Sequence, residues 1–237
     1  MSSNVIQEDP ILTFGIIADV QYADVDDGTD FSQTRQRFYR NSLNLLKNAV
    51  NEWKSNADSV SFILQLGDLI DGKNKQGGLM TSKRALSTAL HPFNSLHVPI
   101  YHIIGNHELY NFTRAFYMTS ALNSSLSLSI EPSSDKLYYT FLPHPKLRIV
   151  AVDSYDLSLL GYEDDQENPN YKTACSLFQQ KNTNTDVNDS TGLECLERRW
   201  AAYNGGVSDS QIAWLQQVLH KAQEKEENVI VMCEFCL

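Results

Sequence analysis

Residues 60–68 read Val-Ser-Phe-Ile-Leu-Gln-Leu-Gly-Asp, an almost unbroken apolar run that ends in a glycine and an aspartate. A short apolar run of this kind predicts a strand that is buried on both faces, as in the parallel sheets of α/β proteins. Gly67 permits a tight turn directly after the strand. Asp68 is then presented at the carboxyl end of the strand, which is where open α/β sheets bind ligands.

The same arrangement occurs once before and once after this stretch. Residues 11–18 form an apolar run that ends in Asp19, and residues 98–104 form one that ends in Gly105-Asn106-His107-Glu108. Helical patterns over residues 32–54 and 82–96 separate the three runs, and this order predicts an α/β fold with parallel neighbouring strands. The apolar positions of the first helical pattern are Phe38, Leu45, Leu46, Ala49, Val50 and Trp53.

The pattern changes in the second half of the chain. Residues 136–141 and 146–153 flank Pro143-His144-Pro145 and predict an antiparallel hairpin, and residues 228–233 predict another buried strand. Residues 161–206 are polar and are expected to form a long excursion, in which the acidic residues 163–167 are a solvated loop. A helix is expected to start at Ser208, where Ser208 and Gln211 fit a capping box. Its core face would consist of Ile212, Leu215, Leu219 and Ala222.

Composition limits the partners that the protein can have. The chain has 237 residues and a formal net charge of -10, so its overall field does not favour nucleic acid. An anionic substrate would need local cations or a bound metal. Residues 1–10 lack the apolar core of a signal peptide, and no apolar run approaches the roughly 20 residues of a membrane span. We expect a cytoplasmic protein without a membrane partner, with a flexible N-terminus over residues 1–10 and reduced cysteines.

The residues that follow the three strands suit a divalent cation. Carboxylate and amide oxygens favour magnesium or manganese, and an imidazole extends the choice to zinc or iron. Each residue also has a purely structural reading, because Asp19 could cap a turn and His107 could be an ordinary residue at a helix start. The joint pattern of three motifs in this order, each directly after an apolar strand, is far more specific than any of its parts.

This pattern resembles the calcineurin-like metallophosphoesterases, whose motifs read D-x-H, G-D-x-x-[DE] and G-N-H-[DE]. Asp19, residues 67–71 and residues 105–108 match these motifs, but Gln21 stands where most members have His. With that change, the chain is similar to the manganese-dependent ADP-ribose/CDP-alcohol diphosphatases. The resemblance implies a metallophosphoesterase-type layered β-sandwich flanked by helices, over residues 11–233.

The resemblance also implies roles for the residues that match. Asp68 would bridge two divalent ions, Asp19 and Gln21 would hold the first ion, and Asn106 would hold the second. His107 would be the catalytic residue at the scissile phosphate. Because a neutral oxygen donor is harder than imidazole, Gln21 favours a dinuclear Mn²⁺ centre, with Mg²⁺ as the alternative.

The reaction implied is hydrolysis of the diphosphate bond in nucleoside-diphosphate-linked small molecules, such as ADP-ribose and CDP-choline. A nucleoside monophosphate would be released. Two ions about 3.5–4 Å apart would hold the phosphate and activate the attacking water.

The superfamily adds a lone His and a G-H-x-H motif that this sequence does not supply. Here Met232-Cys233 is followed by Glu234-Phe235-Cys236-Leu237, and no His follows His220. We therefore expect a C-terminally truncated domain with impaired catalysis. Two alternatives stay open: a non-catalytic isoform or fragment, and a broader phosphodiesterase or phosphatase of the same superfamily.

Overall fold

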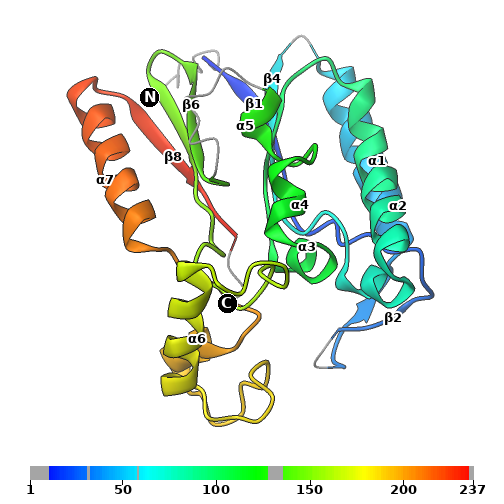
Figure 1. The fold of residues 1–237 in the computed structure, drawn as a ribbon. Helices are drawn as coiled ribbons and strands as arrows, with labels where there is room; N and C mark the ends of the chain where they lie inside the picture. The colour runs from blue at the N-terminus through cyan, green and yellow to red at the C-terminus, as the bar shows by residue number, and fades with distance from the viewer. Residues whose placement is uncertain (1–10, 31–32, 58, 128–135, 235–237) are drawn as a thin grey trace, which may run out of the picture.

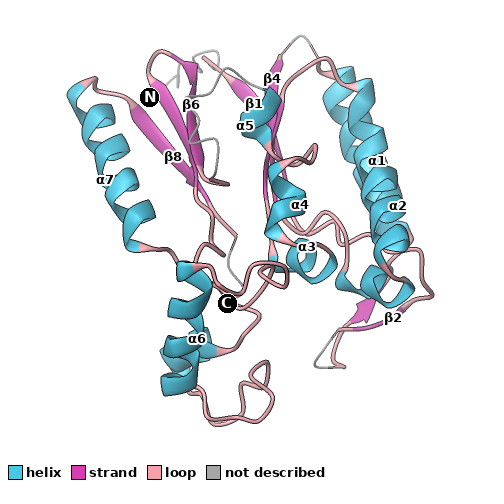
Figure 2. Ribbon diagram, viewed as in Figure 1, coloured by secondary structure: helices cyan, strands magenta, loops and turns pink. Residues whose placement is uncertain are grey.

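The computed structural model describes residues 11–30, 33–57, 59–127 and 136–234. Two β-sheets face each other, and helices cover the outer side of each, so the layers run helix, sheet, sheet, helix (Figure 1). Figure 2 shows the same layers by type of secondary structure. This is the layered α/β sandwich with flanking helices that the sequence predicts. The flexible N-terminus expected for residues 1–10 lies outside the described residues.

The first sheet contains the three strands that carry the motifs. Its order is β1 (Thr13–Ile17), β4 (Val60–Leu66) and β5 (Ile100–Ile103), and all three strands are parallel. Gln65 lies opposite both Ile17 and His102, so the three carboxyl ends meet at one edge. The predicted parallel sheet is confirmed, and its register brings the three motifs together.

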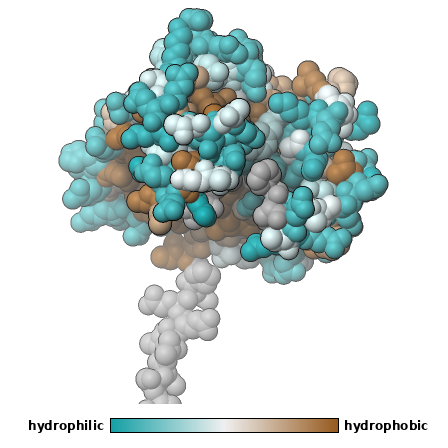
Figure 3. Space-filling model, turned by 90° about the horizontal axis from the view of Figure 1, so that it is seen from below, coloured by the Kyte–Doolittle hydropathy of each residue, from teal (hydrophilic) through white to brown (hydrophobic). Residues whose placement is uncertain are grey.

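The second sheet has the order β6 (Tyr139–His144), β7 (Leu147–Ala151) and β8 (Asn228–Met232). The β6–β7 pair is the predicted antiparallel hairpin, and β8 runs parallel to β7. β8 therefore ends at the same lower side of the molecule as the site-bearing turns of the first sheet (Figure 1). That side is mostly polar on its surface, with scattered apolar side chains (Figure 3).

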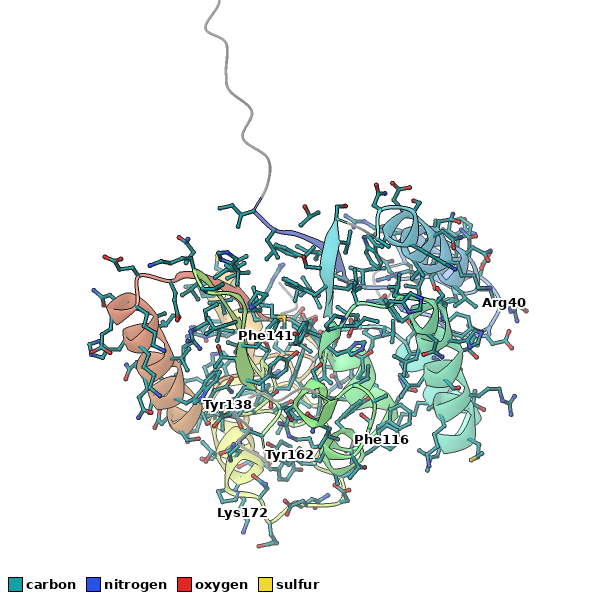
Figure 4. All side chains as sticks on the ribbon, turned by 90° about the horizontal axis from the view of Figure 1, so that it is seen from above. Arg40, Phe116, Tyr138, Phe141, Tyr162 and Lys172 are labelled. Atoms are coloured by element: carbon teal, nitrogen blue, oxygen red, sulfur yellow. The ribbon has the colours of Figure 1, made fainter. Side chains whose placement is uncertain are left out.

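The space between the sheets is filled by apolar and aromatic side chains. Phe62 on β4 stacks on Phe14, with ring centroids 4.9 Å apart, and meets Tyr101 and Phe141 edge-on at 5.8 and 6.0 Å. Such pairs stabilise a core beyond the area they bury. Figure 4 shows Phe141 in the interior, whereas Arg40 and Lys172 lie at the periphery.

Helices complete the outer layers. α1 (Asn41–Ser55) and α2 (Leu79–Leu90) pack on the first sheet, and α7 (Asp209–Glu224) packs on the second. The remaining helices come between α1 and α7 in the sequence. They are η1 (Gly72–Gly77), η2 (His91–Ser95), α3 (Asn106–Asn111), α4 (Arg114–Met118), α5 (Ser124–Ser127), α6 (Pro169–Lys181) and η3 (Cys195–Trp200). No helix among the described residues is long and apolar enough to cross a membrane.

The start of the first helix was predicted too early. The sequence placed it near Ser32, but α1 begins at Asn41, because β2 (Gly28–Thr29) and β3 (Gln36–Arg37) pair as a small antiparallel ribbon before it. Phe38, before the helix, and Leu45, within it, are 54% and 62% exposed, although their spacing placed them on the core face. Leu46 and Val50 make the buried contact with the sheet.

Two strands and one helix are less buried than their apolar sequences predict. Ile16 on β1 and Val231 on β8 are 56% and 47% exposed, because both strands are edge strands among the described residues. On α7, Ala222 is buried and Leu215 packs on the core as predicted, but Ile212 and Leu219 are exposed and Val218 is buried in their place.

The capping box at Ser208 is half correct. Its hydroxyl accepts from the backbone N–H of Gln211, but the Gln211 side chain does not return the bond. It binds the backbone of Asp153 and the carboxylate of Asp156 instead. The region 161–206 also differs from prediction, because α6 and η3 give it structure of its own, while the acidic residues 163–167 are exposed as expected.

We expect Phe62→Ala to lower the free energy of unfolding by about 3–5 kcal/mol, because it leaves a cavity between the sheets. Phe38→Ala is the matched control and should change it by no more than about 0.5 kcal/mol, since Phe38 is largely exposed. Urea denaturation followed by circular dichroism measures both. Equal losses would contradict the placement of Phe38.

Candidate metal centre

Three of the predicted metal ligands lie in strained turns. Asp19, Gln21 and Asp68 have φ angles of 53°, 45° and 54°, in the left-handed region that non-glycine residues rarely adopt. Each such residue costs about 1–3 kcal/mol and persists only where its surroundings enforce it. Strain at three clustered polar residues points to a functional site at the carboxyl ends of β1 and β4.

Glu108 joins the strained turn after β4 to the turn after β5. Its carboxylate accepts hydrogen bonds from the backbone N–H groups of Asp68 at 2.7 Å, Leu69 at 2.6 Å and Gly105 at 2.8 Å. Burial and the neighbouring Asp68 raise the pKa of Glu108 to about 7, against the lowering effect of the amide bonds. The turn after β4 is thereby fixed to the turn after β5.

Asp68 lies at the centre of the arrangement and is 2% exposed. One carboxylate oxygen accepts from the backbone N–H of His107 at 3.0 Å, and the other accepts from the side-chain amide of Gln21 at 3.1 Å. Burial raises the pKa of Asp68 to about 6. A Cβ atom on Gly105 would lie 2.1 Å from Oδ1 of Asp68, so only glycine leaves room for this carboxylate.

Gln21 joins Asp68 to Asp19. Its Nε2 donates to Oδ1 of Asp19 at 3.2 Å, and its Oε1 accepts a short hydrogen bond from the guanidinium of Arg37. A cation between the two carboxylates would require the amide to turn, so that Oε1 faces inward. Nε2 would then face Arg37, which has no acceptor, so Arg37 would have to move. Gln21 therefore fits a metal only with this rearrangement.

Asn106 fits a metal as it stands. It is 3% exposed, and its Nδ2 donates to the hydroxyl of Tyr110 at 3.0 Å. Its Oδ1 is buried without a hydrogen-bond partner. Leaving a buried acceptor unsatisfied costs about 1–3 kcal/mol, and coordination of a metal ion by Oδ1 would remove that cost.

His107 faces the same carboxylates. Its Nδ1 lies 3.0 Å from the backbone nitrogen of Gly72 and 3.3 Å from Oδ2 of Asp71, and its Nε2 lies 3.9 Å from Oδ2 of Asp68. Burial lowers the pKa of His107, but the hydrogen bond to Asp71 and the charges of Asp68, Asp71 and Glu108 outweigh it, so the pKa is raised.

The donor set is two carboxylates and two amides, all oxygen ligands of the kind that manganese and magnesium accept. Across the described ranges, no group of three or more His, Cys, Asp or Glu side chains has the geometry of a metal site. His102, which could have replaced a missing ligand, points into the core and lies 3.1 Å from Oε1 of Gln65.

Sequence reasoning overlooked four residues. Asp71 and Glu108 belong to the quoted motifs, but the sequence analysis assigned them no role in the site. Their position inside these motifs could have marked them as site residues. Arg37 reaches the site only through the β2–β3 ribbon, and Glu234 only from the second sheet, so no local pattern marks either.

Comparison with known proteins agrees with the fold. The family model for the calcineurin-like phosphoesterases matches residues 12–233. A manganese-dependent ADP-ribose/CDP-alcohol diphosphatase of Xenopus tropicalis is 44% identical, over 95% of this chain and 68% of that protein. The protein of the same name from Homo sapiens is 39% identical, over 94% of this chain and 65% of its own length.

A solved structure extends the likeness to three dimensions. The crystal structure of a dimetal phosphatase from Danio rerio superposes with a TM-score of 0.87 at 39% identity, over 95% of this chain and 70% of that one. The chain belongs to the calcineurin-like phosphoesterase family. It spans about two thirds of the length of the relatives that it matches.

We expect Gly105→Ala to lower the affinity for Mn²⁺ at least tenfold, because the added methyl group displaces the Asp68 carboxylate. Gly28→Ala is the control, since its Cβ would meet Tyr39 only at an ordinary 3.5 Å. Mn²⁺ titration followed by electron paramagnetic resonance measures both. Unchanged affinity in Gly105→Ala would mean that Asp68 does not bind the metal.

Proposed function

We propose that the chain catalyses manganese-dependent hydrolysis of the diphosphate bond in nucleoside-diphosphate-linked compounds, with ADP-ribose and CDP-alcohols as substrates. The observation that carries this proposal is the buried Asp68 carboxylate, bonded to the backbone of His107, together with the unpartnered Oδ1 of the adjacent Asn106, at the edge where the strands end. The names of the relatives supply the metal and the substrate class. The cytoplasm remains the proposed location, in keeping with the described cysteines, which form no disulfide.

In this proposal each ligand has a distinct place. Asp19 and Gln21 would hold one ion, Asn106 would hold the other, and Asp68 would contribute to both. The Lewis-acid chemistry that Mn²⁺ would supply when bound is activation of the phosphate and of the attacking water. Glu108 already fixes the turn after β4 to the turn after β5, which holds Asp68 and Asn106 in place before any ligand arrives.

His107 is proposed to donate a proton to the leaving oxygen from Nε2. If its Nδ1 accepts the N–H of Gly72, the neutral ring carries its proton on Nε2. If the ring is cationic, as its raised pKa favours, Nδ1 donates to Asp71 and Nε2 again carries a proton. Both states therefore leave a proton on the nitrogen that faces Asp68.

Arg37 supplies local positive charge in a chain whose net charge is -10. Its guanidinium contacts Gln21, and turning the Gln21 amide onto a metal would release it. A released guanidinium beside the centre suits a phosphate oxygen, because its donors match phosphate geometry. Arg37 is therefore proposed to orient the second phosphate of the substrate.

Asp68→Asn is expected to abolish Mn²⁺-dependent hydrolysis while the fold is retained, because one neutral amide cannot balance two cations. The assay measures nucleoside monophosphate released from ADP-ribose and CDP-choline, beside a cyclic nucleotide and a phosphomonoester. Asp164→Asn, in the exposed acidic loop, is the matched control and should behave as the unmodified chain.

The proposal fails if Asp68→Asn retains a tenth or more of the turnover at saturating Mn²⁺. A preference for the cyclic nucleotide or the phosphomonoester would favour the broader phosphodiesterase or phosphatase reading. Mn²⁺ binding without hydrolysis of any of these compounds would favour a non-catalytic nucleotide-binding role.

Gln21→His is expected to shift the metal preference from Mn²⁺ toward zinc or iron, because imidazole is a softer donor than an amide oxygen. The measurement is competition of Zn²⁺ with Mn²⁺ for the protein in equilibrium dialysis. A preference identical to that of the unmodified chain would show that residue 21 is not a ligand.

A further inference from the structure

We propose that Asn111 is a positioning residue for His107. Asn111 is the last residue of α3 and lies one helical turn after His107. Its side chain ties α3 to the turn that follows β4, and so holds the imidazole ring beside Asp71. This inference rests on the proposed function, because Asn111 would act only through the proton donor His107.

The side-chain amide of Asn111 joins two segments. Its Nδ2 donates to the backbone carbonyl of His107 at 2.7 Å and to that of Asp71 at 3.1 Å. His107 belongs to α3, whereas Asp71 belongs to the turn after β4. Asn74 donates to the same carbonyl of Asp71, but it does so from η1, directly after the turn, and does not reach the helix. The amide of Asn111 uses both of its hydrogens to span the two segments.

The ring of His107 bridges the same two segments. Its Nδ1 lies 3.0 Å from the backbone nitrogen of Gly72 and 3.3 Å from Oδ2 of Asp71. A Cβ atom on Gly72 would lie 2.8 Å from Cδ2 of Tyr110, so the turn packs closely on α3. Hydrogen bonds weaken steeply as distance and angle change, so a small shift of the turn relative to α3 would release the ring. Asn111 prevents that shift.

Asn111 is itself held firmly. Its Oδ1 accepts from Oγ of Ser82 on α2 at 2.7 Å. Ser82 and Asn111 are 1% and 8% exposed, so water competes little for these bonds. If the amide turned over, Oδ1 would face two carbonyl oxygens that cannot donate, so only one orientation satisfies the site. A buried polar network that is fully satisfied is rigid, and here the rigidity extends from α2 to the ring-bearing helix.

Asn182 provides a matched comparison elsewhere in the fold. Its Nδ2 donates to the carbonyls of Val187 and Trp200 at 3.0 and 2.8 Å, and its Oδ1 accepts from the backbone N–H of Asn184 at 3.0 Å. It is 4% exposed. These bonds lie within residues 182–200 and not at the turn after β4. Replacing Asn182 therefore removes an equivalent set of bonds without disturbing the surroundings of His107.

The first measurement is amide hydrogen exchange in the metal-free full chain. Leu has a similar shape to Asn but no donor, so Asn111→Leu removes both bonds to the carbonyls. We expect the Gly72 amide to exchange about tenfold faster or more, relative to the Ile63 amide of β4, because exchange reports local opening. A general loss of stability would accelerate both amides alike. Asn182→Leu should therefore leave this ratio unchanged.

The second measurement is the hydrolysis of ADP-ribose at saturating Mn²⁺. Asn111→Leu should lower kcat by about 10–100-fold and leave KM nearly unchanged, because proton donation stabilises only the transition state. Asn182→Leu should retain both constants. If Asn111→Leu does not fold, Ser82→Ala replaces it. That variant frees Oδ1 and should produce the same two effects to a smaller extent.

Selective exposure of the Gly72 amide together with a lower kcat supports the role of Asn111. An unchanged ratio of the two exchange rates overturns it, and so does a selective change in exchange with an unchanged kcat. In both of these cases hydrolysis by the unmodified chain leaves the proposed function intact. Absence of hydrolysis by the unmodified chain overturns the proposed function and this role together.

Discussion

The hydrogen bonds that Glu108 accepts are the constraint on which the site depends. One buried carboxylate receives the backbone N–H groups of Asp68, Leu69 and Gly105, and so locks the turns after β4 and β5 to each other. Without that lock, the left-handed conformation of Asp68 would have no compensation for its strain. The same lock brings His107 close enough for its backbone to bond to the Asp68 carboxylate.

The sheet explains why these turns can meet at all. In a parallel sheet the carboxyl ends of neighbouring strands lie at one edge, and here Gln65 is in register with both Ile17 and His102. Residues about 40 positions apart in sequence are thereby brought within hydrogen-bond distance. The aromatic core around Phe62 then holds the second sheet against the first, which places the end of β8 beside the Gly67 turn.

The concentration of negative charge favours binding of a divalent cation at this site. Asp68 and Glu108 are buried, Glu234 is partly buried and Asp19 is exposed, and together they concentrate negative charge at this edge. Burial raises the pKa of Asp68, Glu108 and Glu234. Such crowding is unfavourable by itself and favourable around a divalent cation. Asp71 and Gly72 fix the ring of His107 beside these carboxylates, where a proton donor suits a phosphoryl-transfer site.

The apolar runs and their terminal motifs determined the parallel first sheet, the hairpin, the four ligand candidates and His107, because strand periodicity and residue chemistry are local properties. Helix starts and exposed faces were less predictable, because strand pairing and burial depend on distant segments. The β2–β3 ribbon stands where the first turns of α1 were predicted. Ile16 and Val231 are exposed because β1 and β8 are edge strands among the described residues. Only the tertiary structure decided that Arg37 contacts Gln21 and that Glu234 reaches the Gly67 turn. Both contacts join elements far apart in the chain, and their geometry follows from how the sheets and loops pack.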